Sequence, residues 1–223
     1  MRKKSEILEI MEIFNRDDPN PRCELNYSNA YTLLVAVVLS AQTTDKGVNR
    51  ATAELFKVAD TPQKMVELGE QKLISYIRTI GLFNNKAKNI ISMSKDLLER
   101  FGGEVPERRE DLETLAGVGR KTANVVLNVW YHKPALAVDT HVMRISHRLD
   151  FSQGKTPLAV EQDLLKVLPD KYVINANHWL VLFGRYICKR SAPNAKNAPY
   201  HHIVAVRIKG YKVRNFLTLS NYN

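Results

Sequence analysis

Hydrophobic side chains recur along the chain at the spacing of α-helices. Ile7, Leu8, Met11 and Phe14 fall on one face of a helix, and residues 29–41 are apolar nearly all round. The second pattern is typical of a helix buried in the middle of a helical core. No segment carries a confident two-residue alternation, so strands are not expected. The pattern predicts an all-α protein of roughly nine or ten helices.

Residues that start and stop helices support this prediction. Thr61-Pro62 and Thr156-Pro157 each place a capping threonine before a proline, a residue favoured at the first helical position. Gly102-Gly103 is expected to end a helix over about residues 86–101. A last long helix is expected from about Ile174 to Cys188.

Composition narrows the class of protein. The chain has 223 residues, of which 44% are hydrophobic and 25% charged, values near those of globular proteins. Its longest apolar stretch falls short of the ~20 residues of a membrane-spanning helix. Two cysteines, Cys23 and Cys188, cannot form a disulfide framework, which agrees with a reducing compartment. We therefore expect a monomeric cytoplasmic protein with no membrane partner.

Basic residues are concentrated at the end of the chain. The formal net charge is +10, but Asp170 is the last carboxylate, and nine basic residues follow it. This asymmetry favours a polyanionic partner, nucleic acid before membrane, although a solubilising basic tail would look the same. If the partner is DNA, the cytoplasmic protein is expected at the nucleoid.

Two glycines separate apolar helical segments in the sequence LAGVGRKTANVVL of residues 115–127. The amides of Gly117 and Gly119, with the first turn of a helix starting near Arg120, can bind a phosphate of a DNA backbone. A nucleotide-binding P-loop needs Gly directly before Lys121 and a preceding strand, and this segment has neither. A plain turn between core helices explains the glycines but not the adjacent Arg120 and Lys121.

The glycine hairpin and three further segments together resemble the bacterial endonuclease III family. The segments are LSAQTTD (39–45), IGLFNNKA (80–87) and AVDTHV (137–142), and the resemblance runs from about residue 7 to 188. It implies a two-lobed all-α helix-hairpin-helix DNA glycosylase fold with its active-site cleft between the lobes. The implied division is a central six-helix lobe over 22–134 with the hairpin at about 108–131, a second helical lobe of 1–21 plus 135–190, and a basic tail over 191–223.

The resemblance also implies an activity and its residues. The family combines a base-excision DNA glycosylase with an abasic-site lyase that removes oxidised pyrimidines from duplex DNA through a lysine Schiff base. Lys121 matches the nucleophile. Asp139 matches a catalytic carboxylate that stabilises the sugar cation, assists the lysine as a base, or does both; a helix N-cap is its ordinary role.

Further residues are implied to contact DNA. Gln42 matches the residue that fills the space of the extruded base, and Leu82 matches an apolar wedge. A polar helix cap and a core leucine are the ordinary interpretations of these two positions. The implied backbone contacts come from the hairpin and from a segment after Asp139: Gly117, Val118, Gly119, Arg120, Thr140, His141 and Arg144.

Two positions depart from the family pattern. Ala116 stands where the hairpin usually has proline, which relaxes the turn but removes no phosphate-facing amide. The family also binds a four-iron iron-sulfur cluster at C-x6-C-x2-C-x5-C starting at Cys188, where this chain continues with Ala195, Ala198 and Val204. From these substitutions we expect no cofactor, no metal and a mobile segment after about Arg190.

Two alternatives stay open from the sequence. A mismatch-specific glycosylase of the same superfamily would lack a nucleophilic lysine at position 121. A helix-hairpin-helix protein that only holds DNA would keep the hairpin and lose the chemistry.

Overall fold

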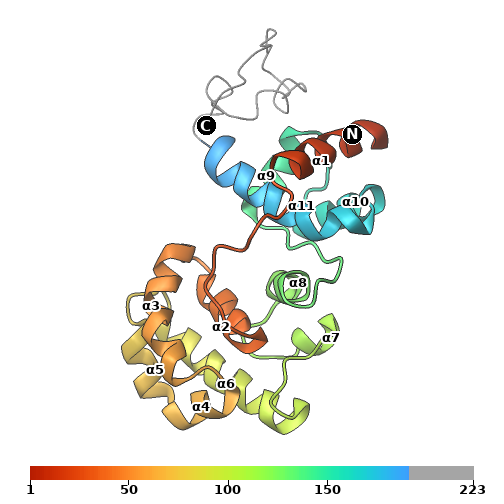
Figure 1. Ribbon diagram of the computed structural model, residues 1–223. Coiled ribbons are helices and arrows are strands. Elements are labelled where there is room, and N and C mark those ends of the chain that lie inside the picture. The colour runs from red at the N-terminus through yellow and green to blue at the C-terminus, as the bar shows by residue number, and fades with distance from the viewer. Residues whose placement is uncertain (191–223) are drawn as a thin grey trace. The chain divides into compact units, whose positions relative to one another are not determined.

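The fold is helical throughout residues 1–190, which are the residues that the computed structural model describes (Figure 1). This range contains eleven α-helices and one π-helical turn, η1, and no extended strand. The all-α prediction is therefore confirmed. The helix count exceeds the expected one because short helices were not visible in the hydrophobic pattern. Within the same range, no helix has the length and apolar character needed to cross a membrane.

The chain forms two compact units. One consists of Met1–Pro21 with Val138–Asn223, of which residues up to 190 are described, and the other is Arg22–Ala137. We call these the terminal unit and the central unit. Each is built around its own buried side chains and is considered by itself.

The central unit is organised around α2, whose residues 31–39 are all buried. Asn29 caps this helix by accepting a hydrogen bond from the Thr32 amide. Helices α3, α6 and α8 pack against it. The helices of this unit are α2 (Ala30–Ser40), α3 (Asp45–Val58), α4 (Pro62–Leu68), α5 (Glu70–Ile77), α6 (Phe83–Phe101), α7 (Arg109–Leu112) and α8 (Arg120–Val129). The predicted starts at Pro62 and Arg120 are confirmed.

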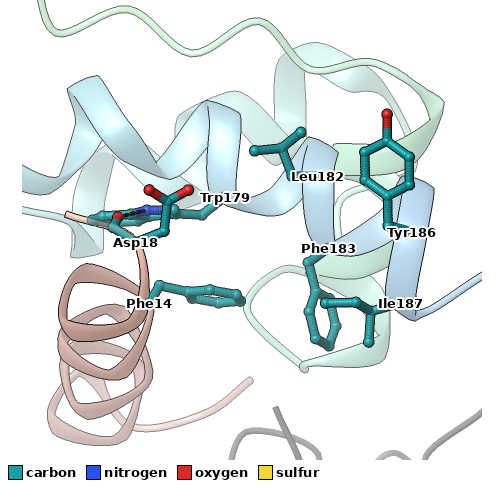
Figure 2. Close-up of a pocket in the computed structure, with 7 residues that line it drawn as sticks. All are labelled: Phe14, Asp18, Trp179, Leu182, Phe183, Tyr186 and Ile187. Atoms are coloured by element: carbon teal, nitrogen blue, oxygen red, sulfur yellow. Dashed lines mark hydrogen bonds between the residues drawn. The ribbon is translucent and has the colours of Figure 1, made fainter. Parts of the chain in front are cut away.

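The terminal unit is held by an aromatic cluster between its first and last helices (Figure 2). Phe14 stacks on Trp179 with ring centroids 6.1 Å apart and meets Phe183 edge-on at 5.5 Å. The Trp179 indole donates to the Asp18 carbonyl at 2.8 Å, so its polar group is satisfied. The elements of this unit are α1 (Lys4–Asp17), α9 (Thr140–Arg148), α10 (Pro157–Val167), α11 (Asp170–Leu182) and η1 (Phe183–Ile187).

The helix expected from about Ile174 to Cys188 starts four residues earlier and ends at Ile187, and its last turn is a π-helix. Helix α11 starts at Asp170, and the chain continues from Phe183 with π geometry, in which the Cys188 amide donates to the Phe183 carbonyl at 2.8 Å. At this point Gly184 lies so close to α9 that a Cβ would be 3.0 Å from Ile145. The wider turn thus accommodates close packing between two helices, a tertiary cause that a sequence pattern does not contain.

Candidate active site

The two hairpin glycines are required for different reasons. Gly117 has a φ of +78°, and a Cβ there would lie 2.9 Å from the Asn89 side chain on α6, so only glycine fits. Val118 is buried and its amide donates to the Leu115 carbonyl at 3.1 Å, which closes the turn. Gly119 has an unstrained backbone, and a Cβ added to it would meet no atom within 4 Å. The open side of Gly119 leaves room for an external group to approach the backbone.

Helix α8 begins immediately after these glycines and has no side-chain cap. Gly119, which has no side chain to offer, is its N-cap. Lys121, the second residue of the helix, is exposed. Asn124 and Asn128 fix the buried face by donating to the Leu136 and Ala135 carbonyls at 2.8 and 2.9 Å. The rigid helix therefore places an exposed amine beside an open anion-binding turn.

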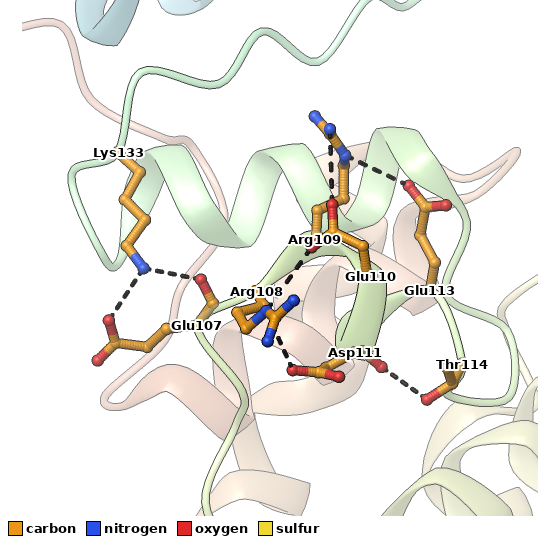
Figure 3. Close-up of polar contacts among 8 residues, drawn as sticks. All are labelled: Glu107, Arg108, Arg109, Glu110, Asp111, Glu113, Thr114 and Lys133. Atoms are coloured by element: carbon orange, nitrogen blue, oxygen red, sulfur yellow. Dashed lines mark hydrogen bonds and ion pairs between the residues drawn. The ribbon is translucent and has the colours of Figure 1, made fainter.

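Charged side chains surround α7, the first helix of the hairpin (Figure 3). Arg109 lies 3.8 Å from Glu113, and Lys133 forms a 3.0 Å ion pair with Glu107. Lys133 also donates to the Glu107 carbonyl at 2.7 Å, which joins the end of α8 to the segment before α7. Exposed pairs of this kind contribute about 0–1 kcal/mol each, so they orient the hairpin more than they stabilise it.

Gln42 and Leu82 share an uncommon backbone conformation. Their φ angles are +58° and +60°, in the left-handed region that non-glycine residues rarely adopt. Gln42 is exposed on the loop after α2, and Leu82, at the N-cap of α6, is 60% exposed. The interpretation of Leu82 as a core leucine is therefore wrong. Strained, exposed residues of this kind are more common at functional sites than elsewhere.

Lys86, the lysine inside the IGLFNNKA segment, was not predicted from the sequence to have a role. This residue is buried, and its Nζ donates to the Leu39 and Ala41 carbonyls at 2.9 and 2.6 Å. Burial lowers the pKa of its ammonium group. A signal was present, because Lys86 lies on the same helical face as the buried Ile90 and Met93.

Asp139 is the N-cap of α9, as expected for its ordinary role. Its Oδ1 accepts hydrogen bonds from the His141 and Val142 amides, both at 2.8 Å. The hydrogen bonds found for this half-buried carboxylate within residues 1–190 all use Oδ1. The other oxygen, Oδ2, thus keeps its lone pairs while the side chain is held in one orientation. Thr140 next to it is exposed, and His141 is half-buried.

Arg144 lies within the terminal unit with its guanidinium directed at the end of η1. Its Nη2 donates to the Gly184 and Cys188 carbonyls at 2.7 and 3.3 Å. Arg148 supplies further hydrogen bonds to the Cys188 and Lys189 carbonyls at 3.1 and 2.9 Å. Burial lowers the Arg144 pKa. The two arginines therefore hold the last described turn of the chain on α9.

The expected site residues are divided between the units. The central unit contains Gln42, Leu82, the hairpin residues 117–120 and Lys121, whereas Asp139, Thr140, His141 and Arg144 belong to the terminal unit. The surroundings of the Lys121 amine are therefore described within the central unit, and those of the Asp139 carboxylate within the terminal unit.

An all-α unit carrying an open glycine hairpin is the architecture of helix-hairpin-helix DNA glycosylases. Residues 35–170 match the family described as HhH-GPD superfamily base excision DNA repair protein. A structure of a thermostable thymine-DNA glycosylase has the same fold, with a TM-score of 0.76 at 20% identity over 91% of this chain and 95% of that one. This likeness concerns the fold alone.

Relatives with higher identity define the family more narrowly. The chain is 53% identical to endonuclease III of Haemophilus influenzae and 51% identical to that of Escherichia coli K12, each over 85% of this chain and 90% of the relative. It also matches the structure of a trapped endonuclease III-DNA covalent intermediate, with a TM-score of 0.84 at 42% identity over 91% of this chain and 96% of that one. The chain belongs to the endonuclease III family.

The expected function is confirmed by this membership. The protein is a base-excision repair enzyme that combines DNA glycosylase and abasic-site lyase activities, and its partner is damaged duplex DNA. The alternative of a helix-hairpin-helix protein that only holds DNA is therefore set aside.

The expectation of no cofactor is corrected by the same comparisons, because these relatives and structures are of the family that carries a four-iron, four-sulfur cluster. That expectation rested on Ala195, Ala198 and Val204, which lie outside the described residues, as does the segment expected to be mobile. The thiols present do not match a four-cysteine donor set, since the chain has two cysteines in all. Cys188 is buried, with its Sγ 3.1 Å from Arg148 Nη1. Residues 1–190 hold no group of three His, Cys, Asp or Glu side chains able to bind a metal.

Proposed function

We propose that Lys121 is the amine nucleophile of this glycosylase and lyase and that Asp139 is its carboxylate partner. The observation that carries the proposal is the placement of Lys121, an exposed amine two residues after Gly119 on a rigid helix without a side-chain cap. A DNA phosphate bound at the hairpin would bring the adjoining deoxyribose within reach of that amine.

The Lys121 amine attacks C1′ of a nucleotide turned out of the duplex. The bond between C1′ and the base breaks, and the base leaves with the electron pair and takes up a proton. The amine loses one proton after it bonds to C1′, and O4′ takes up a proton as the C1′–O4′ bond breaks, which leaves a protonated Schiff base on the opened sugar. Loss of a proton from C2′ expels the 3′ phosphate, which cleaves the strand.

The Asp139 carboxylate serves this sequence from a fixed position. Two amide hydrogen bonds to Oδ1 lock its orientation, so Oδ2 can face the reacting sugar without reorganisation. A carboxylate there would stabilise positive charge developing on the sugar, and it would accept a proton from the amine. Both roles are consistent with the geometry of the cap.

The hairpin supplies a grip on the DNA backbone that does not depend on base sequence. The amides of Gly117 and Gly119 and the first turn of α8 provide donors and a positive helix end, while Arg120 adds a cation. Val118 anchors this turn in the core. On the other unit, Thr140, His141 and Arg144 are proposed to lie near phosphates beside the turned-out nucleotide.

Gln42 and Leu82 are proposed to enter the duplex. An amide side chain can replace the hydrogen bonds of the extruded base, and an exposed leucine can separate stacked bases as an apolar wedge. Oxidised pyrimidines in duplex DNA, and abasic sites, are the proposed substrates. The proposed place of action is the bacterial nucleoid, in the cytoplasm.

Borohydride reduction tests the proposal directly, because only an amine nucleophile forms an imine that borohydride can reduce. A trapped endonuclease III-DNA covalent intermediate is known from one of the related structures. Purified protein incubated with a thymine-glycol duplex and borohydride should give a covalent adduct on a denaturing gel, with the modified peptide containing Lys121. Absence of an adduct, or modification of another lysine, would overturn the assignment.

A further inference from the structure

Lys86 is a buried cation whose partners are backbone carbonyls at the end of another helix. It lies in α6 with 5% of the residue exposed, and Nζ reaches the Leu39 and Ala41 carbonyls and, at 3.3 Å, the Thr43 hydroxyl. These three acceptors match the three protons of an ammonium group. The last carbonyls of a helix lack helical partners and carry its negative end, so a cation is well placed there.

The acceptors of Lys86 enclose Gln42. Ala41 precedes Gln42 and Thr43 follows it, and the Thr43 amide donates to the Ser40 carbonyl at 3.0 Å. Gln42 is thereby held with its φ of +58° between two residues that contact one ammonium group. The loop therefore has this conformation before DNA binds.

The second strained residue, Leu82, precedes Lys86 by one helical turn and is held by the backbone of α6. The backbone amide of Lys86 makes the first hydrogen bond of α6 by donating to the carbonyl of the N-cap Leu82 at 3.0 Å, and Leu82 has a φ of +60°. One turn further on, the Asn89 side chain lies against Gly117 of the hairpin. Lys86 and Asn89 lie one turn apart on α6 and Leu82 caps its start, so this helix connects Leu82, the Gln42 loop and the hairpin turn.

We infer that Lys86 is a positioning residue whose ammonium group holds the Gln42 loop in its inserting conformation, at the start of the helix that Leu82 caps. The inference rests on the proposed function, since it takes both residues to enter DNA. A neutral side chain of similar size would leave the Leu39 and Ala41 carbonyls without this donor, and the loop would relax toward an unstrained φ. Misplacement of an inserted group by about 1 Å can lower a rate by ~100-fold.

The test compares Lys86→Met with the wild type on two duplexes under single-turnover conditions. One carries thymine glycol paired with adenine, which must be unstacked before excision, and the other carries a preformed abasic site with no base to extrude. We expect Lys86→Met to lower excision of thymine glycol by about 10- to 100-fold and β-elimination at the abasic site by less than about threefold. 2-Aminopurine beside the lesion should show a smaller fluorescence rise with the variant. Lys95→Met, an exposed lysine on the same helix, is the matched control and should resemble the wild type.

Each other outcome is decisive. Equal losses on the two duplexes would show that Lys86 only supports the fold, and wild-type rates on both would show that it has no positioning role. If Lys86→Met does not fold, Thr43→Val is the second variant, because it removes one acceptor of the ammonium group. It should lower the ratio of thymine-glycol excision to β-elimination by a smaller factor. An unchanged ratio would overturn the inference. A wild type that forms no borohydride adduct would instead refute the proposed function, a result visible before any variant is compared.

Discussion

At the scale of single residues, Lys121 offers the sharpest test of the chemistry. Lys121→Gln should abolish the borohydride adduct, because an amide cannot form an imine, and should leave duplex affinity within a few fold, because the hairpin is intact. Trapping gels and equilibrium binding measure the two effects. Lys72→Gln, at an exposed position on α5, is the control and should keep the adduct. An undiminished adduct in Lys121→Gln would contradict the assignment.

Asp139 has a structural role as a helix cap and a proposed chemical role, and a single substitution can distinguish the two. Asp139→Asn retains an oxygen for the His141 and Val142 amides, so the melting temperature should change little. It loses the negative charge, and turnover should fall by ~100-fold, the scale of losing one acid-base or electrostatic partner. Calorimetry and single-turnover excision give the comparison. Full turnover would reduce Asp139 to a helix cap.

The contacts predicted from sequence differ from the contacts that were missed in how far apart the two partners lie along the chain. The cap role of Asp139 follows from its neighbours, whose amides are two and three positions along the chain. Lys86 finds its acceptor Leu39 at a separation of 47 residues, and Arg144 finds Gly184 at 40. A hydrogen bond between near neighbours can be predicted from the sequence, whereas a contact that depends on the packing of two helices cannot.

At the scale of elements, the two hairpin glycines should respond differently to alanine. Gly117→Ala places a methyl against Asn89 at a φ of +78°, so the free energy of unfolding should fall by at least about 1 kcal/mol. Gly119→Ala meets no atom within 4 Å and should leave stability nearly unchanged, yet weaken duplex binding because the methyl occupies the approach of a phosphate. Thermal unfolding and binding titrations distinguish them. Equal effects on stability would contradict this account of the turn.

Element boundaries were predictable where a local signal exists. Thr61 and Thr156 cap their helices as expected, accepting from the amides of Lys64 and Ala159. The change to π geometry at Phe183 was not predicted; it coincides with the close approach of Gly184 to α9, a tertiary contact. The cofactor shows another limit: a count of thiol positions in one chain led to an expectation that the family comparisons overturn.

At the scale of the whole molecule, charge is distributed unevenly, and this predicts the salt dependence of binding. A chain ending at Arg190 lacks five basic residues and no carboxylate: Lys196, Arg207, Lys209, Lys212 and Arg214. Its affinity for duplex should fall, and the slope of log K against log salt should flatten by about 0.9 for each phosphate that the shortened chain no longer neutralises. Titrations at several salt concentrations measure the slope.

Saturating DNA provides the control for this truncation. The rate of β-elimination at a preformed abasic site should then match that of the full chain, because Lys121 and Asp139 are retained. An unchanged slope would show that the segment neutralises no phosphate. A truncated protein that fails to fold would show that residues 191–223 contribute to the structure rather than to affinity alone.

If Leu82 is the proposed wedge, its left-handed, exposed position favours activity at the expense of stability. A leucine at φ +60° with 60% of its surface in water costs the free protein about 1–3 kcal/mol of backbone strain and leaves apolar area uncovered. Leu82→Asn, which tolerates this φ, should raise the melting temperature and lower excision of a paired lesion. Selection for thermal stability alone should therefore replace this leucine. The selected proteins would have higher melting temperatures and lower excision activity.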